Sequence, residues 1–245
     1  MRIEENIDKI TRWIKEEVER SGGRGVVFGL SGGLDSAVTA ALCRRAFPAE
    51  KCLGVFMPCE SGPKDREDAG LLVEVLDISW LEVPITGAFN SLWGELGEIK
   101  AERDTSLAVA NLKPRLRMTV LYYLAAAKGL RVAGTSNKSE ILVGYFTKHG
   151  DGAADFYPLA DFLKKEVREM AARLEVPQSI ISKTPSGGLW EGQTDEDELG
   201  FTYNQLDDYL EKGVAPPEIK EKIERLIEGS KHKRNPPLKF FREDL

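Results

Sequence analysis

A short apolar run, a tight glycine turn and a helix follow one another over residues 26–47, and this order constrains the fold more than any other feature of the sequence. Val26 to Leu30 has the length and the apolar character of a buried strand. The turn SGG comes next, and the segment LDSAVTAALCRRAF after it has the pattern of a helix. A strand that leads into a helix through so short a turn is typical of proteins with a parallel sheet.

The alternation of strands and helices continues along most of the chain. Apolar runs predict further strands at Cys52–Met57, Trp80–Ile85 and Leu130–Ala133, and helical patterns lie at residues 3–20, Asp65–Leu76, Ser106–Lys128, Asp161–Leu174 and from Pro217 to about residue 230. Pro114 is expected to break or kink the long helical stretch that contains it. We therefore expect one α/β domain over residues 1–245, with a doubly wound, mostly parallel sheet flanked by helices and with ligands at the carboxyl ends of the strands.

Three segments show little periodicity. The chain from Thr135 through Leu159 is rich in loop residues, and TPSGGLWEGQTDEDELG at residues 184–200 suits a mobile surface loop or lid. The acidic run Asp195–Glu198 within it is interpreted as a solvated loop or a helix start rather than as a second metal site. The tail HKRNPPLKFF is basic and aromatic, and we expect its apolar residues to dock on the protein.

Composition narrows the class of protein. A net charge of -6 and a pI near 5.3 argue against a chain whose main task is to coat nucleic acid. No stretch approaches the roughly 20 apolar residues of a membrane span, and the start has no apolar signal-peptide core, so a cytoplasmic location is expected. Cys43, Cys52 and Cys59 form no CxxC pair and are interpreted as reduced, buried thiols. Since the histidines are few, any metal is expected to be a hard cation held by carboxylates.

The strongest chemical signal is GLSGGLDSA, residues 29–37, which lies between the predicted strand and helix. It lacks the GK[ST] ending of the Walker loop and is not GxGxxG. Glycines let backbone amides approach an anion, Ser31 and Ser36 add hydroxyl groups, and a helix N-terminus favours negative charge. The segment is expected to hold a phosphate group, although SGG by itself can also be an ordinary strand-to-helix turn.

Asp35 is informative because a carboxylate beside a phosphate repels it unless a cation lies between them. Mg²⁺ is the natural bridge, since it takes oxygen ligands from one or two carboxylates and from substrate phosphates. A second carboxylate is therefore expected at this place.

The motif SGGxDS after a strand resembles the PP-loop of the ATP pyrophosphatases, which cleave ATP between the α and β phosphates. Within that superfamily the chain most resembles the ammonia-dependent NAD synthetases, and the resemblance extends over nearly its whole length. It is carried by NLKPRLRM (residues 111–118), GTSNKSE (134–140), TKHGDGAADFYPL (147–159), TPSGGLWEGQTDEDELG (184–200) and HKR (232–234). Each segment alone is weak evidence for the family, but the five segments in this order and spacing are specific to it.

The resemblance implies an adenine nucleotide alpha hydrolase-like, Rossmann-like fold without a glutaminase domain. It implies a ligase that forms NAD from deamido-NAD and ammonia through an adenylated intermediate, releasing AMP and pyrophosphate. ATP is then a co-substrate and Mg²⁺ a cofactor. Families of this type are homodimers with the dinucleotide site near the subunit interface, and no nucleic-acid or membrane partner is implied.

Individual residues follow from the same resemblance. The implied ATP ligands are Gly29, Leu30, Ser31, Gly32, Gly33, Leu34, Asp35, Ser36, Thr135, Lys164 and Ser186. The implied deamido-NAD ligands are Arg115, Lys148, Asp155, His232 and Lys233, and Asp35 and Glu140 are the implied Mg²⁺ ligands. Asp151, in HGDG, is the candidate for binding ammonium and taking its proton.

Other interpretations remain open from the residues alone. Arg115 and Lys164 have the pattern of solvated helical surface, and KHKR is a common disordered basic end. Two other functions are compatible with a PP-loop: a PP-loop adenylating enzyme that acts on tRNA, and a nucleotide-binding module without catalysis. Acidic charge and the lack of CxxC pairs argue against the first, and Asp35 together with Glu140 argues against the second.

Overall fold

The computed structural model describes residues 2–99, 105–188, 190 and 192–240. Within them lies a parallel sheet of four strands in the order β3-β2-β1-β4. The strands are β1 (Val26–Leu30), β2 (Cys52–Phe56), β3 (Ser79–Glu82) and β4 (Arg131–Val132). Strand β1 pairs in parallel with both β2 and β4, and Val26 lies opposite Cys52 and Arg131. The predicted parallel α/β sheet is confirmed.

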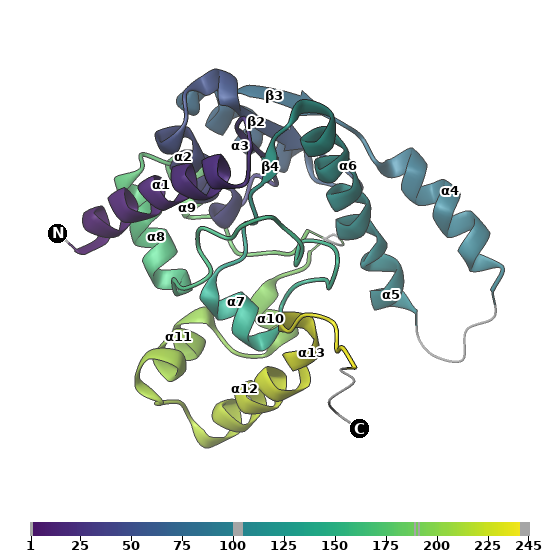
Figure 1. Cartoon of the computed structure of the whole chain (residues 1–245). Coiled ribbons are helices and arrows are strands. Elements are labelled where there is room, and N and C mark those ends of the chain that lie inside the picture. Colours follow the sequence, from purple (N-terminus) through teal and green to yellow (C-terminus); the bar gives the residue numbers. More distant parts are fainter. Residues whose placement is uncertain (1, 100–104, 189, 191, 241–245) are drawn as a thin grey trace.

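Helices surround this sheet, as Figure 1 shows. Their bounds are α1 (Arg2–Arg20), α2 (Leu34–Ala46), α3 (Pro63–Leu76), α4 (Thr86–Gly97), α5 (Ser106–Ala110), α6 (Leu112–Lys128), α7 (Lys138–Val143), α8 (Lys164–Arg173), α9 (Gln178–Ile181), α10 (Asp195–Leu199), α11 (Tyr203–Lys212), α12 (Pro217–Gly229) and α13 (Lys231–Arg234), with a 3₁₀ turn η1 (Ala49–Lys51). The predicted helix at residues 3–20 is confirmed by α1, whose Ile7, Ile10, Ile14 and Val18 are buried.

Two apolar layers cover the two faces of the sheet. On one face, α1, α2 and α8 pack against the side chains of Phe28 and Phe56. On the other face, α6 and the start of α4 pack against Val27 and Val55. Because successive residues of a strand point to opposite faces, the unbroken apolar run of β1 supplies both layers at once. The doubly wound arrangement is thereby confirmed.

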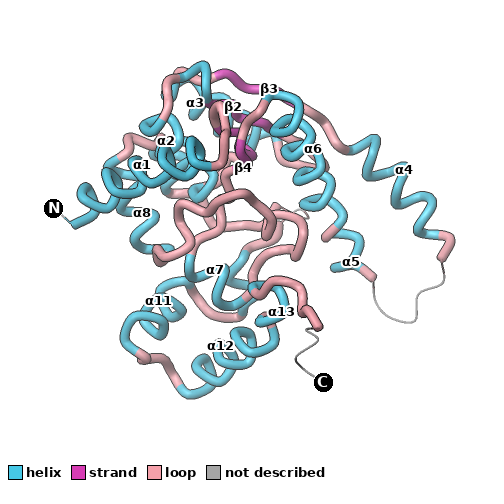
Figure 2. Tube along the Cα trace, in the orientation of Figure 1, coloured by secondary structure: helices cyan, strands magenta, loops and turns pink. Residues whose placement is uncertain are grey.

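A third cluster lies beyond the carboxyl ends of the strands. It joins α7, α10, α11 and α12 through buried residues such as Val143, Leu206 and Ile223. In Figures 1 and 2 these helices sit below the sheet, and most of the loops gather between the two parts. The loops that leave the strands are therefore covered by a helical unit from the C-terminal half.

Several boundaries differ from the sequence-based expectation. The stretch 106–128 is two helices, α5 and α6, so the predicted break is confirmed; it falls at Asn111, which places Pro114 in the first turn of α6 where no intrahelical donor is required. The strand predicted at Trp80–Ile85 ends at Glu82, although the amides of Val83 and Ile85 still donate to the carbonyls of Phe56 and Pro58. Helix α8 begins at Lys164, three residues later than predicted at Asp161.

Two segments expected to be loops contain helices. Helix α7 lies inside the region 135–159, where Asn137 and Glu140 form a capping box and Gly144 ends the helix with φ 71°. Helix α10 lies inside 184–200 and begins at Asp195, so the acidic run is a helix start, but Asp195 itself is buried rather than solvated.

The expected docking of the tail is wrong for its described part. Leu238 and Phe240 are exposed, although Lys233 and Arg234 just before them donate hydrogen bonds to backbone carbonyls. The expected buried thiols are confirmed, since Cys43, Cys52 and Cys59 are all free and buried. Across the described residues, no helix combines the length and the apolarity that crossing a bilayer requires.

Candidate functional site

The candidate site lies where the strand order reverses. Strand β1 connects toward β2 on one side and pairs with β4 on the other, so the loops that leave β1 and β4 diverge and open a crevice at their carboxyl ends. A cavity of about 840 Å³ occupies this position and is lined by residues of both loops, among them Ser31 and Ser136. The volume is in the range of ligand pockets.

The SGG turn is held in one conformation by its own hydroxyl groups. Ser31 Oγ accepts the amide of Gly33 at 3.1 Å and lies 2.9 Å from Ser36 Oγ, which donates to the Gly33 carbonyl at 2.9 Å. Gly32 has φ 71°, and a Cβ there would lie 2.6 Å from the Asp65 carbonyl oxygen. A side chain at Gly32 is therefore excluded by both backbone conformation and space.

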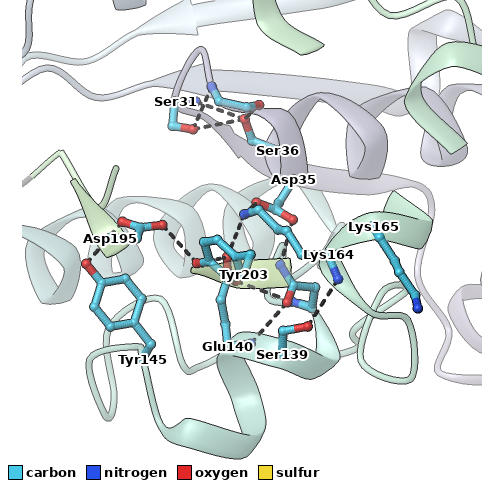
Figure 3. A network of polar contacts seen from close by, with 12 residues as sticks. Ser31, Asp35, Ser36, Ser139, Glu140, Tyr145, Lys164, Lys165, Asp195 and Tyr203 are labelled. Carbon is cyan, nitrogen blue, oxygen red and sulfur yellow. Dashed lines mark hydrogen bonds and ion pairs between the residues drawn. The ribbon is translucent and has the colours of Figure 1, made fainter. Parts of the chain in front are cut away.

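A buried ammonium joins the two carboxylates expected to hold a metal. Lys164 Nζ lies 2.6 Å from Asp35 Oδ2 and 2.9 Å from Glu140 Oε1 (Figure 3). Lys164 is only 2% exposed, so the expectation of a charged helical surface from its sequence pattern alone is wrong. The three residues come from α2, α7 and α8, and the first turns of these helices meet beside the cavity.

The electrostatics of the cluster follow from burial and from the close approach of like charges. Burial first, and the Asp35 carboxylate second, raise the pKa of Glu140 to about 7. Burial alone would lower the pKa of Lys164, but the carboxylates of Asp35 and Glu140 outweigh it and raise that pKa. The ammonium thus stays charged at neutral pH, while one of the two carboxylates is poised to take up a proton.

A second layer of polar groups stands behind this cluster. The Tyr203 hydroxyl lies 2.9 Å from Asp195 Oδ2 and 3.3 Å from Glu140 Oε1, and the Tyr203 ring centroid lies 4.7 Å from Lys164 Nζ. Tyr145 donates toward the other oxygen of Asp195 at 3.0 Å. Burial raises the pKa of Asp195, whereas Lys164 and the two tyrosine hydroxyls lower it.

The cavity contains most of the expected ATP residues. Those that line it are Gly29, Leu30, Ser31, Gly33, Leu34, Asp35, Ser36, Thr135, Lys164 and Ser186, together with Glu140, Asp151 and Lys233. Gly32 belongs to the same loop but faces Asp65. The ATP set is therefore brought together around one cavity.

The other four residues expected to bind deamido-NAD lie outside that cavity lining. Arg115 Nε donates to the Lys148 carbonyl at 3.3 Å, and Lys148 Nζ donates to the His232 carbonyl at 2.7 Å, so α6, the 144–153 loop and α13 meet at this point. Asp155 accepts the Val132 amide at 2.8 Å and is 3.4 Å from the Tyr122 hydroxyl of α6. Arg115, Asp155 and His232 are exposed.

Asp151 is the expected proton acceptor and faces the cavity. Its Oδ1 accepts the Thr147 amide at 2.9 Å. The surrounding protein raises the pKa of Asp151 by desolvation, although the hydrogen bonds from the backbone and Thr147 and the charge of Lys233 act in the opposite direction. Lys233 Nζ donates to the carbonyls of Gly144 and Phe146 at 2.7 and 2.9 Å.

Three polar residues that line or adjoin the cavity were not singled out from the sequence. Asn137 donates to Asp35 Oδ1 at 2.8 Å, and its capping-box pattern NKSE could have revealed it. Arg117 Nε donates to the Met57 carbonyl at 3.1 Å. Lys183 contacts the Gly32 carbonyl, Asp65 and Asp68 at 3.1, 2.7 and 3.1 Å. For Arg117 and Lys183 no local pattern distinguishes them from surface cations.

The donor set suits a hard divalent cation. Asp35 and Glu140 already converge on one ammonium beside the cavity, which shows that both can face a single positive charge. Within the described part of the chain, no three His, Cys, Asp or Glu side chains are grouped as a metal site. Mg²⁺ is commonly held by one or two carboxylates, and phosphate oxygens and water complete its coordination.

Comparisons with known proteins agree with this site. A sequence model of the NAD synthase family matches residues 6–237. The chain is 45% identical to the NH(3)-dependent NAD(+) synthetase of Carboxydothermus hydrogenoformans over 234 residues, 96% of each protein. It superposes with a TM-score of 0.80 on the NH3-dependent NAD synthetase of Campylobacter jejuni, at 30% identity over 98% of this chain and 100% of that one. It also superposes on an NMN synthetase of Francisella tularensis, with a TM-score of 0.91 and 36% identity over 97% of this chain and 98% of that one. With a family match that spans most of its length and a curated relative of this identity, the chain belongs to the NAD synthase family.

Proposed function

We propose that the protein amidates deamido-NAD to NAD with ammonia, using ATP to activate the carboxylate. The observation that carries this proposal is the meeting of Asp35, Lys164 and Glu140 at the end of the SGG turn, in a chain of the NAD synthase family. A carboxylate resists attack by ammonia because its charge is delocalised and oxide is a poor leaving group. Attack of one carboxylate oxygen on the α-phosphorus releases pyrophosphate and leaves an acyl adenylate with AMP as leaving group.

The ATP half of the site would act by position and charge. The backbone of Gly29 to Ser36 and the N-terminus of α2 hold the triphosphate, as a glycine turn before a helix does in other phosphate sites. Thr135 and Ser186 line the same cavity and would contact ATP there. Lys164 supplies a permanent positive charge for the oxygens of the departing pyrophosphate, a task of electrostatic stabilisation that needs no nucleophilic side chain.

Asp35 and Glu140 would hold Mg²⁺ when MgATP binds. The ion would neutralise charge on the phosphate oxygens. Asp35 and Glu140 would fix its place relative to the SGG turn, and the Lys164 ammonium would be available to donate to phosphate oxygen. Burial and, second, the Asp35 carboxylate raise the pKa of Glu140, and a divalent cation would favour its ionised form.

The acceptor would reach the site from the side of α6 and α13. Arg115, Lys148, Asp155 and His232 surround that approach, and Lys233 connects it to the cavity. Ammonium needs a carboxylate to bind it and to take one proton before ammonia attacks the adenylate carbonyl. Asp151 lines the same cavity as Lys233 and the ATP residues and is proposed for that role.

A second candidate is amidation of the mononucleotide to NMN. It is favoured by the likeness to the Francisella tularensis NMN synthetase. We place the dinucleotide first because the curated relative at 45% identity makes NAD. A preference for nicotinate mononucleotide of tenfold or more in kcat/KM would reverse that order.

The remaining expectations from the sequence stay predictions. They are a homodimer, one domain over residues 1–245 without a glutaminase domain, and a cytoplasmic location. Exposed apolar side chains on α4 and α6, among them Trp93 and Tyr123, support the homodimer. Figure 1 shows α4 projecting from one side of the molecule. Light scattering of the purified protein tests it directly.

The decisive experiment is an omission assay. Purified protein is incubated with deamido-NAD, MgATP and ammonium, each left out in turn, while NAD, AMP and pyrophosphate are measured. The proposal requires the three products in equal amounts and their loss in Asp35→Ala. Formation of AMP and pyrophosphate without NAD would move a different acceptor, such as tRNA, to first place.

A further inference from the structure

Helix α11 lies behind the catalytic cavity and contributes no residue to its lining. Its Tyr203 contacts the lining residues Glu140 and Asp195, and its Asp207 contacts Ser139 and Lys165, which adjoin lining residues in the sequence. Tyr203 and Asp207 are four residues apart, so they share one face of the helix. Both are about 1% exposed. Neither residue has been given a role so far in the reaction.

Asp207 joins the backbone segments that carry Glu140 and Lys164. Its Oδ1 accepts the Ser139 hydroxyl at 2.5 Å, and its Oδ2 accepts the Lys165 amide at 2.9 Å. Ser139 Oγ in turn accepts the Lys164 amide at 3.1 Å. Ser139 precedes Glu140 in α7, and Lys164 opens α8, so one buried carboxylate fixes the first turns of both helices.

Tyr203 fixes the side chains of the same two residues. Its hydroxyl lies 3.3 Å from Glu140 Oε1, and its ring lies under the Lys164 ammonium with 4.7 Å to the centroid. Figure 3 shows Tyr203 between Asp195 and the Asp35–Lys164–Glu140 cluster. The two contacts are of the kind that orient a metal ligand from behind without touching the metal.

We propose that Tyr203 and Asp207 are positioning residues for the MgATP site. Tyr203 sets the carboxylate of Glu140 and the ammonium of Lys164, and Asp207 sets the helix turns from which they extend. The inference rests on the proposed function only in that Asp35 and Glu140 are taken to hold the cation. It assigns to helix α11 a part in ATP binding that its place outside the cavity lining does not suggest.

Two matched controls lie on the same helix. Asp208 is next to Asp207 but pairs with Lys212 at the surface, and Tyr209 bonds to Glu224. Asp207→Asn keeps the size of the side chain but replaces one acceptor by a donor, so one of its two hydrogen bonds is lost. Tyr203→Phe keeps the ring and removes the hydroxyl.

The test is the affinity of the full-length protein for ATP, measured by calorimetry without acceptor, once with Mg²⁺ and once with EDTA. Asp207→Asn and Tyr203→Phe are expected to weaken MgATP binding about tenfold, the usual lower bound for residues behind metal ligands. The ratio of the ATP affinity with Mg²⁺ to the ATP affinity with EDTA should fall. The affinity for deamido-NAD should change less than twofold. Asp208→Asn and Tyr209→Phe should bind both ligands as the wild type does.

A purely structural role would weaken the binding of both ligands equally and leave the gain in ATP affinity from Mg²⁺ unchanged, and that result would overturn the inference whatever the change in Tm. If Asp207→Asn does not fold, Tyr203→Phe decides alone. Asp35→Ala and Glu140→Gln are measured in parallel. Unchanged MgATP binding in these two would refute the proposed metal ligands, whereas their loss together with wild-type binding in the α11 variants would refute only the positioning role.

Discussion

The two halves of the candidate site are built differently. Around Lys164 the charged groups are nearly enclosed and bonded to one another, with side-chain exposures of 2%, 17% and 13% for Lys164, Asp35 and Glu140. Around Lys148 the polar groups lie at the surface, and the side chains of Arg115 and Lys148 contact backbone carbonyls rather than acids. The charged groups around Lys164 are oriented without a ligand. The charged groups around Lys148 remain accessible to a ligand.

The contrast has a chemical reason. Stabilising a departing pyrophosphate requires charges that are already oriented, because reorganisation during the reaction would add to the barrier. Recognition of a large dinucleotide requires contact area more than fixed orientation, and exposed cations can be recruited by the ligand itself. Substitutions in the two halves should therefore differ in what they change.

The largest effect is expected for Lys164→Met. It leaves Asp35 and Glu140 uncompensated in a buried place, so we expect NAD formation to disappear and the free energy of unfolding at pH 8 to fall by about 3 kcal/mol. Urea unfolding measures this loss. Lys165→Met is the matched control, because Lys165 pairs with Glu211 at the surface and should change stability by less than about 0.5 kcal/mol. Equal effects of the two substitutions would erase the contrast between enclosed and exposed charge.

The next effect concerns Asp151. Asp151→Asn is expected to lower kcat about 100-fold and to raise the KM for ammonium, since a positioned base contributes factors of this order. The KM for ATP should stay within twofold of the wild-type value. Steady-state kinetics with ammonium as the varied substrate give the result, and unchanged kcat and KM for ammonium would remove Asp151 from the mechanism.

A smaller effect is expected at the open half. Lys148→Ala should raise the KM for deamido-NAD about tenfold, because an exposed charge-assisted contact to the ligand is lost while chemistry at the adenylate is untouched. Stability and the KM for ATP should hardly change, since the Lys148 ammonium contacts one carbonyl. A rise in the KM for ATP instead would contradict the assignment of Lys148 to the deamido-NAD half of the site.

The smallest effect is a pH dependence of stability. The protein around Asp151 raises its pKa by desolvation, but the residue keeps contact with solvent, so the expected effect is small. A raised folded pKa means that the contribution of Asp151 to stability is complete below 3.8 and is lost as pH rises through the folded pKa. The stability of the wild type relative to Asp151→Asn should therefore fall as pH rises from 4, and chemical unfolding at a series of pH values measures it. If the stability of the wild type relative to Asp151→Asn rose with pH, the pKa of Asp151 would not be raised in the folded protein.

Periodicity predicted the part of the fold that depends on repeated burial. The strand Val26–Leu30 and the helix at 3–20 recur in the structure because each buries apolar residues at the spacing of its own element. Helix α7 was missed because it has only six residues and depends on its caps, Asn137 and Gly144, rather than on a repeated apolar face. Helix α4 was missed because Phe89 is its one buried residue, which leaves no periodic burial to detect.

The candidate site likewise has one part that a local sequence pattern predicts and one part that it does not. Asp35 and the SGG turn could be located from a local motif with a physical reason, and the cavity forms at that motif. Lys164, Asp195 and Tyr203 could not be placed together by local pattern, because each lies on a different helix and only tertiary packing brings them within hydrogen-bonding distance. From the sequence, Lys164 was assigned to the site only by resemblance to the family. Asp195 and Tyr203 were not assigned to it.

The central claim is that the carboxylate is activated by adenylation, and transfer of a labelled oxygen tests it most directly. Deamido-NAD that carries ¹⁸O in its nicotinate carboxylate is converted with MgATP and ammonium, and the products are analysed by mass spectrometry. Adenylation predicts one ¹⁸O atom in the phosphate of AMP for each NAD formed and none in pyrophosphate. Label in orthophosphate or pyrophosphate, with unlabelled AMP, would contradict the mechanism and the use of Lys164 and the SGG turn derived from it.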